Sequence, residues 1–178
     1  MYRLSKLKYV FPIGLLIAFF LDGALSNVFS GAFFSYPYSM VSHLVLLWLV
    51  LGYFFENEVQ IPLTGFAVVT GIAFDLYYSG ILGLFMVLFP LIIGLTRAIG
   101  KYFSPTFLTA IMIYFIDLAV FEFANYLAYM IIGIAHASFS SFLLYTLAPT
   151  LALNLVYFVV LYFPISLLYA HYNVEPRS

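Results

Sequence analysis

The chain has no cysteine, which excludes disulfide bonds, thiol catalysis and zinc sites built on cysteine ligands. Charged residues are also scarce: Lys, Arg, Asp and Glu make up 7% of the 178 residues, against about 25% in soluble domains. The six Lys and Arg are outnumbered by seven Asp and Glu, so the chain offers no basic surface for nucleic acid. A water-soluble domain needs far more polar surface than this, and the composition therefore indicates an integral membrane protein.

Hydrophobic residues make up 66% of the chain, and they are concentrated in long runs. Because a transmembrane helix needs about 20 mostly apolar residues, we predict an all-α polytopic membrane protein, a compact bundle of six transmembrane helices. The predicted spans cover residues 9–29, 38–55, 61–78, 80–97, 106–134 and 142–169. The third and fourth are separated by almost nothing, so we expect them to be short or to form a tight hairpin. The spans leave no room for a soluble domain, and residues 1–178 are predicted to form a single transmembrane domain.

The basic residues predict the orientation of this bundle. They lie before the first span, after the fourth and after the sixth, at positions Arg3, Lys6, Lys8, Arg97, Lys101 and Arg177. With six spans all of them fall on one side, and the positive-inside rule makes that side, with both termini, cytoplasmic. As an alternative, the first apolar segment is a secretory signal cleaved near Ala24–Ser26. The segment is long for a signal, and the predicted topology requires it as a span.

Four carboxylic acids lie within predicted spans, at Asp22, Asp75, Asp117 and Glu122. An ionisable residue inside a membrane is costly, so such residues face a bundle interior or a cavity and are candidates for function. No Lys or Arg lies deep in any predicted span, so a buried ion pair is not the obvious solution. A protonated acid would instead donate a hydrogen bond to a neighbouring helix.

Small and polar residues recur every four positions in two of the predicted spans. The first span carries Gly14, Ala18, Asp22 and Ser26, and the third carries Ala67, Gly71, Asp75 and Ser79. Stripes of small residues let membrane helices approach closely. We therefore hypothesise that the first and third spans pack through these stripes, with Asp22 near Asp75. The alternative is that each Asp reaches the outer interface or a neighbouring hydroxyl.

The last two predicted spans also carry polar faces. In the fifth, one face comprises Glu122, Asn125, Tyr126 and Tyr129. Asp117 lies about 140° around the helix from Glu122, so we expect one acid to face the bundle and the other a partner or the interface. In the sixth, the polar face comprises Thr150, Asn154 and Tyr157. Such faces serve helix packing in the simplest interpretation, and a substrate pocket or partner surface in the alternative.

Catalytic and cofactor motifs are missing from the sequence. The three histidines, His43, His136 and His171, lie in different segments without ligand spacing, so we interpret each as a lone residue and predict no metal site. No nucleotide-binding fingerprint or nucleophile elbow is present. Two intramembrane aspartates suggest an aspartyl protease, but no supporting motif accompanies them. We predict a protein that is not an enzyme, with no catalytic residues and no cofactor.

Residues 65–84 carry a recognisable pattern, in which Gly71 precedes Asp75 by four residues and Gly80 and Gly83 follow. This segment resembles the MreD family of rod shape-determining proteins. The resemblance implies a non-enzymatic scaffold of the cell-elongation machinery in the bacterial cytoplasmic membrane. It implies association with MreC, a protein with a single membrane span, and with other elongation proteins, linking peptidoglycan synthesis to the MreB cytoskeleton. It also implies a fold resembling the substrate-binding subunits of energy-coupling-factor transporters.

A vitamin-binding subunit of such a transporter is therefore the alternative function. It predicts an outward-facing cavity of about 300–1,000 Å³, lined by Asp22, Asp75, Glu122, Asn125 and Asn154. The scaffold hypothesis instead makes the small and polar residues contacts between helices or with a partner in the bilayer. These candidates are Gly14, Ala18, Asp22, Gly71, Asp75, Gly80, Gly83, Asp117, Glu122, Asn125 and Asn154. The loop of Glu56, Asn57 and Glu58 is a further candidate for a basic partner, or else a solvated turn.

Overall fold

A computed structural model of the chain describes residues 7–56 and 61–173, and every regular element in these ranges is helical. In chain order the elements are α1 (Leu7–Val28), α2 (Ser30–Phe33), α3 (Leu44–Phe55), α4 (Leu63–Phe74), η1 (Asp75–Ser79), α5 (Leu84–Gly100), α6 (Phe107–Ile131), α7 (Phe139–Phe142), η2 (Leu143–Leu147) and α8 (Ala148–Asn173). The wider π-helical turns η1 and η2 extend α4 and lead into α8. The predicted all-α class is confirmed for these residues.

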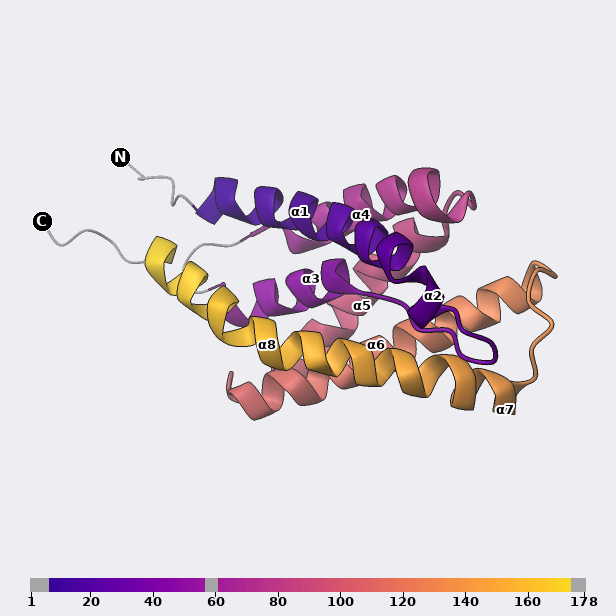
Figure 1. The fold of residues 1–178 in the computed structure, drawn as a ribbon. Coiled ribbons are helices and arrows are strands. Elements are labelled where there is room, and N and C mark those ends of the chain that lie inside the picture. Colours follow the sequence, from indigo (N-terminus) through magenta and orange to yellow (C-terminus); the bar gives the residue numbers. More distant parts are fainter. Residues whose placement is uncertain (1–6, 57–60, 174–178) are drawn as a thin grey trace, which may run out of the picture.

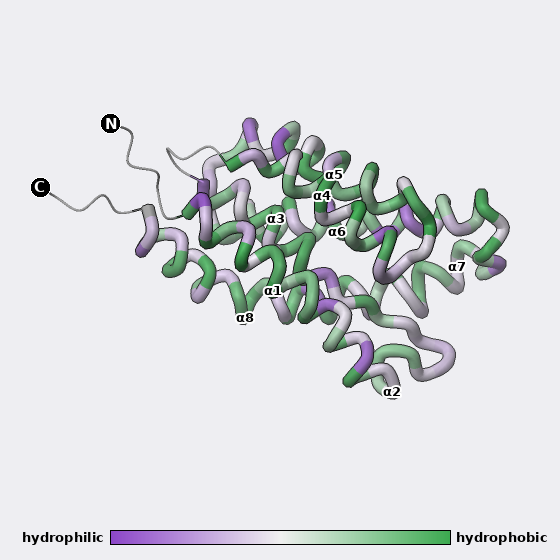
Figure 2. Tube along the Cα trace, turned by 90° about the horizontal axis from the view of Figure 1, so that it is seen from above, coloured by the Kyte–Doolittle hydropathy of each residue, from purple (hydrophilic) through white to green (hydrophobic). Residues whose placement is uncertain are grey.

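The longer helices run back and forth along one direction, so that each of α1, α3, α4, α5, α6 and α8 points opposite to the one before it (Figure 1). The beginning of α1 and the end of α8 lie at the same end of the bundle, called here the terminal end. The connections that follow α1, η1 and α6 lie at the opposite end, called here the distal end. Figure 2 shows apolar residues along the helices, interrupted by hydrophilic ones at isolated positions.

The helices differ in length, and the lengths divide them into two groups. Three stretches, Leu7–Val28, Phe107–Ile131 and Phe139–Tyr172, are long and apolar enough to cross a membrane. Three shorter apolar helices cover Leu44–Phe55, Leu63–Ser79 and Leu84–Gly100. At about 1.5 Å per residue the 12 residues of α3 extend only about 18 Å, which is short of a hydrocarbon core of about 30 Å.

Two helices begin later than the corresponding predicted spans. The second predicted span began at residue 38, but α3 begins at Leu44, and residues 38–43 lead into it without helical structure. The fourth began at residue 80, but α5 begins at Leu84 after a turn. In both cases the helix starts later because a carboxylate from another element binds the amides of its first turn, as described below.

The α3 helix lies at the centre of the bundle and contacts α1, α5, α6 and α8. Every residue from Ser42 to Gly52 is buried, which suits a helix that is apolar all the way round. The indole Nε1 of Trp48 donates to the carbonyl of Phe11 at 3.1 Å, joining α3 to α1. The short helix is thus enclosed by its longer neighbours.

The predicted packing of the first span on the third through small residues is wrong. A Cβ atom at Gly14 would lie 2.0 Å from the Trp48 ring, so the α1 stripe faces α3. A Cβ at Gly71 would lie 2.4 Å from the carbonyl oxygen of Phe85, so the α4 stripe faces α5. Each stripe packs on the helix that its own aspartate caps. Contact between α1 and the α4–η1 segment is aromatic instead, with Phe19 packing edge-on against Phe74.

Candidate functional site

Asp22, at the distal end of α1, binds the beginning of α3. Its Oδ1 accepts hydrogen bonds from the Leu44 amide at 2.7 Å and from the Ser42 hydroxyl at 2.6 Å, and its Oδ2 accepts one from the Val45 amide at 2.9 Å. The first amides of a helix have no partners within it, and the positive end of the helix dipole favours a carboxylate there. Asp22 is only 4% exposed, so its carboxylate is almost fully enclosed by the protein. Asp22 therefore acts as the N-cap of a helix that begins inside the protein.

Asn154 of α8 completes the same helix start from the other side. Its Oδ1 accepts from the His43 amide at 2.8 Å, and its Nδ2 donates to the carbonyl of Val41 at 2.7 Å. The Thr150 hydroxyl, one turn earlier, accepts from the Val41 amide at 3.2 Å. Backbone groups buried without partners are costly in a bilayer, and these side chains supply the partners for residues 41–43.

Asp75 performs the same task for α5. Its carboxylate accepts from the amides of Phe85 at 2.8 Å, Met86 at 3.2 Å and Gly83 at 2.8 Å. Gly80 and Gly83 have φ angles of 69° and 101°, in the region that favours glycine, and they turn the chain back toward this carboxylate. The pattern of Gly71, Asp75, Gly80 and Gly83 thus builds one hairpin. Asp22 and Asp75 thus cap different helices, and no hydrogen bond joins the two acids among the described residues.

The other two acids of the predicted spans lie on α6 and bind side chains from different parts of the bundle. Glu122 pairs through Oε1 with Nε2 of His43, and Asp117 accepts from the Thr96 hydroxyl of α5 at 2.6 Å. Glu122 is 3% exposed and Asp117 is fully buried. The prediction that one acid would face outward is therefore wrong. Neighbouring elements cover α6 on both of the sides to which Asp117 and Glu122 point.

A cavity of about 710 Å³ lies at the distal end, beside the start of α3. Its walls come from α1, α2, residues 34–43, the end of α4, η1, α5, α6 and η2. Asp22, Glu122 and Asn125 line it, as does His43. Asp75 and Asn154, which were predicted to line such a cavity, do not. Both side chains are instead engaged with the backbone of α5 and of residues 41–43, as described above.

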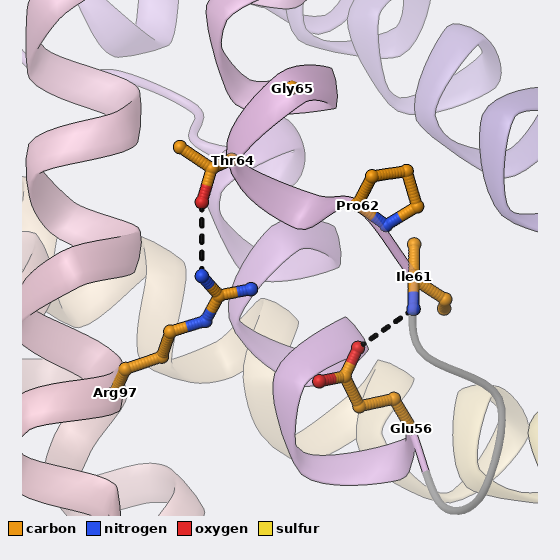
Figure 3. Close-up of a pocket in the computed structure, with 6 residues that line it drawn as sticks. All are labelled: Glu56, Ile61, Pro62, Thr64, Gly65 and Arg97. Carbon is orange, nitrogen blue, oxygen red and sulfur yellow. Dashed lines mark hydrogen bonds between the residues drawn. The ribbon is translucent and has the colours of Figure 1, made fainter.

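A second cavity, of about 530 Å³, lies at the terminal end between α3, α4 and α5 (Figure 3). Arg97 donates to the Thr64 hydroxyl at 3.0 Å, and the Ile61 amide donates to the Glu56 carboxylate at 3.2 Å. Partial burial raises the pKa of Glu56 above its usual value. Asn57 and Glu58, the rest of the predicted partner loop, lie outside the described residues, as do Arg3, Lys6 and Arg177.

Three buried polar atoms among the described residues have no hydrogen-bond partner: Asp117 Oδ1, Asn125 Oδ1 and the Tyr169 hydroxyl. Of these residues, only Asn125 lines the distal cavity. Within residues 7–56 and 61–173 no group of three or more His, Asp or Glu side chains could hold a metal ion. The site is therefore a network of helix caps with one partly unsatisfied cavity beside it.

Sequence reasoning missed the central role of His43, which was interpreted as a lone residue. Ser42 and His43 directly precede the uninterrupted apolar run that begins at Leu44, and a polar pair in that position signals a helix start. The signal was present, but the partners were not local. Glu122 and Asn154 lie 79 and 111 positions from His43.

Comparisons with known proteins give one consistent result. A sequence model described as rod shape-determining protein MreD matches residues 7–172. The cell shape-determining protein MreD of Streptococcus pneumoniae (strain ATCC BAA-255 / R6) is 26% identical over 162 residues, covering 90% of this chain and 96% of that protein. No solved structure matches the chain significantly.

Proposed function

The chain belongs to the MreD family of rod shape-determining proteins, and from this premise we propose that it is a non-catalytic scaffold of the bacterial cell-elongation machinery. The observation that carries the proposal is the family match over residues 7–172, which confirms the resemblance seen in four residues of the sequence. A role in cell shape follows from the family. The scaffold would pair with an MreC-like protein and couple peptidoglycan synthesis to the MreB cytoskeleton.

The proposed topology is a single domain of six spans with both termini in the cytoplasm. The longer helices alternate in direction (Figure 1), and Lys8 lies in the first turn of α1, Arg97 in the last turn of α5 and Lys101 directly after α5. These helix ends lie at the terminal end. This distribution supports a cytoplasmic terminal end under the positive-inside rule. Residues 39–43, which are partly or fully buried, precede the short α3 in the same passage, since non-helical backbone is tolerated at membrane depth where protein encloses it.

The proposed docking face for the partner's single helix lies on α8. The exposed residues Ala148, Ala152 and Val156 follow one another at four-residue spacing, and Val160 continues the row. Small residues on an exposed helix face let a second membrane helix approach closely. The carboxylates of Asp22 and Asp75, by contrast, are occupied by the amides of helix starts, which favours a structural role for these two acids.

Copurification tests this proposal. The full chain is expressed with the MreC-like protein of the same bacterium, extracted in detergent and purified through a tag on one partner. We expect a stable complex, lost when Ala152→Trp blocks the α8 face and retained when Ile17→Trp enlarges an exposed residue of α1 instead. Wild-type protein that is monodisperse but does not retain the partner would contradict the scaffold function. Loss of the complex with both variants would contradict the α8 face alone.

A substrate-binding subunit of an energy-coupling-factor transporter remains the second candidate. The observation that favours it is the distal cavity of about 710 Å³, lined by Asp22, Glu122 and Asn125. Its volume lies within the range typical of small-molecule sites. Copurification with transporter ATPase subunits and a bound vitamin, instead of an MreC-like protein, would identify this function.

A further inference from the structure

The lining of the distal cavity contains more acidic than basic side chains. Two carboxylic acids, Asp22 and Glu122, belong to it, and no Lys or Arg does among the described residues. One histidine, His43, is the sole basic side chain in this lining and is paired with Glu122. An anionic ligand would meet acids without a strong cation to offset them, so the occupant that suits this cavity is neutral or positively charged.

The acceptors in the cavity are unequally occupied. Both oxygens of Asp22 are bound to the start of α3. Glu122 uses Oε1 for His43. Its Oε2 accepts no hydrogen bond from the described residues and is not one of the fully buried, unpartnered atoms named above. The amide oxygen of Asn125, one turn further along α6, has no partner either. Rotation about the soft terminal torsion of Asn125 would turn this oxygen toward a ligand.

Aromatic rings complete the environment. Phe74, Phe85 and Tyr129 line the cavity from α4, α5 and α6, and Tyr129 shares α6 with Glu122. The face of an aromatic ring attracts a cation, most strongly where water is excluded. A free carboxylate oxygen beside such rings, joined by the Asn125 amide oxygen once it has rotated out of its buried position, matches a group that is positively charged and donates several hydrogen bonds.

We propose that the distal cavity binds an ammonium group, through Glu122 Oε2 and the Asn125 amide oxygen. The three N–H donors of a primary ammonium suit these two acceptors, and the aromatic walls suit its charge. The group arrives on a small amine or on the headgroup of a lipid from the surrounding bilayer. This site goes beyond the scaffold role and does not depend on the α8 docking face.

Binding to the purified full chain tests the proposal, with phenethylamine and phenethyl alcohol as probes of equal shape. Isothermal titration is expected to show the amine binding at least about tenfold more tightly than the alcohol. Glu122→Gln removes the charge and is expected to weaken amine binding by about tenfold, while Asp117→Asn neutralises a buried acid of the same helix outside the cavity and leaves it unchanged. Equal binding of both probes, or equal effects of both variants, would overturn the proposal.

A third variant keeps the test informative if Glu122→Gln fails to fold. Asn125→Asp adds a second carboxylate to the free acceptor position and is expected to strengthen amine binding by about threefold to tenfold. An unchanged or weakened affinity in this variant would argue against an ammonium site. Retention of the MreC-like partner by all three variants would show that the scaffold role is separate.

Lipid analysis distinguishes the two sources of the ammonium group. The protein is purified from membranes and reconstituted in nanodiscs of equal parts phosphatidylethanolamine and phosphatidylglycerol, and retained lipid is quantified by native mass spectrometry. Enrichment of phosphatidylethanolamine in the wild type but not in Glu122→Gln identifies a lipid headgroup. Phenethylamine binding without lipid enrichment identifies a free amine. Absence of both would refute the proposal.

Discussion

At the distal end Asp22 and Asp75 are almost fully buried, whereas at the terminal end Glu56 is half-buried and Arg97 is exposed. The distal acids accept hydrogen bonds from five backbone amides in total, two at Asp22 and three at Asp75. Glu56 accepts one, and Arg97 binds only a hydroxyl in the contacts described above. The difference teaches that a charge within the bundle is tolerated where unpaired amides of a helix start need an acceptor.

Asp22→Leu is expected to produce the largest effect. It leaves the Leu44 and Val45 amides and the Ser42 hydroxyl buried without an acceptor, at a cost of about 1–3 kcal/mol for each unsatisfied group. The free energy of unfolding, measured by steric trapping or SDS titration in mixed micelles, should fall by about 4 kcal/mol or more. Asp22→Asn keeps one acceptor oxygen and should lose about half as much. An unchanged free energy of unfolding in Asp22→Leu would contradict the claim that the helix starts at the distal end need a buried acceptor.

Two glycines of α4 provide a matched pair. Gly71→Ala places its Cβ 2.4 Å from the Phe85 carbonyl oxygen and 2.6 Å from the Met86 backbone, which must shift, while Gly65→Ala meets nothing within 4 Å. We expect Gly71→Ala to lower the free energy of unfolding by about 3 kcal/mol through overpacking. Gly65→Ala should raise it by less than about 1 kcal/mol through helix propensity. Equal effects in the same unfolding assay would show that the α4–α5 contact is looser than the structure indicates.

Thr96→Val tests whether the stability cost of losing a polar group depends on its burial or on its place along the bundle. Thr96 lies one residue before the exposed Arg97 but is fully buried. The variant leaves Asp117 without its hydroxyl partner and should cost about 2 kcal/mol. If burial sets the cost, the double variant Thr96→Val with Asp117→Leu should lose less than the sum of the single variants. Strict additivity in the double-mutant cycle would mean that the hydroxyl and the carboxylate contribute independently.

Arg97→Gln is expected to have the smallest effect on stability. The guanidinium is exposed and donates to Thr64 at the surface, so its loss should change the free energy of unfolding by less than about 0.5 kcal/mol. Lys101→Gln, a matched change just beyond α5, should be equally mild. A decrease in the free energy of unfolding above about 1.5 kcal/mol in the Arg97 variant alone would show that Arg97 contributes as much as a buried hydrogen-bonding group.

Local sequence patterns predicted much of this molecule. Continuous apolar runs gave the helical class and the approximate positions of the helices, because burial and backbone pairing in a bilayer leave few alternatives to a helix. A tight hairpin between the third and fourth spans was one of the two predicted alternatives, but the cap that Asp75 forms within it was not predicted, although the acid and the amides lie within 11 residues of each other. Local periodicity could not identify the partners of α3, since Asp22, Glu122 and Asn154 reach its start from three other helices.

The stripes of small residues show a second limit of the sequence. Periodicity correctly marked Gly14 and Gly71 as places of close approach, because a small residue every four positions forms a groove on a helix. It did not specify which helix fills the groove. That choice depends on the shapes of Trp48 and of the α5 backbone, which are known only after the bundle is assembled.

The bonds that hold residues 41–43 have a consequence for biosynthesis. The hydrogen bond from the His43 amide to Asn154 cannot form until Asn154, 111 residues later in the chain, has been synthesised. The bond from the Val41 amide to Thr150 depends on later synthesis in the same way. A nascent chain that ends before α8 therefore lacks these partners for the peptide groups of Val41 and His43, directly before α3. The early helices of this protein reach their final arrangement only after translation of the last one.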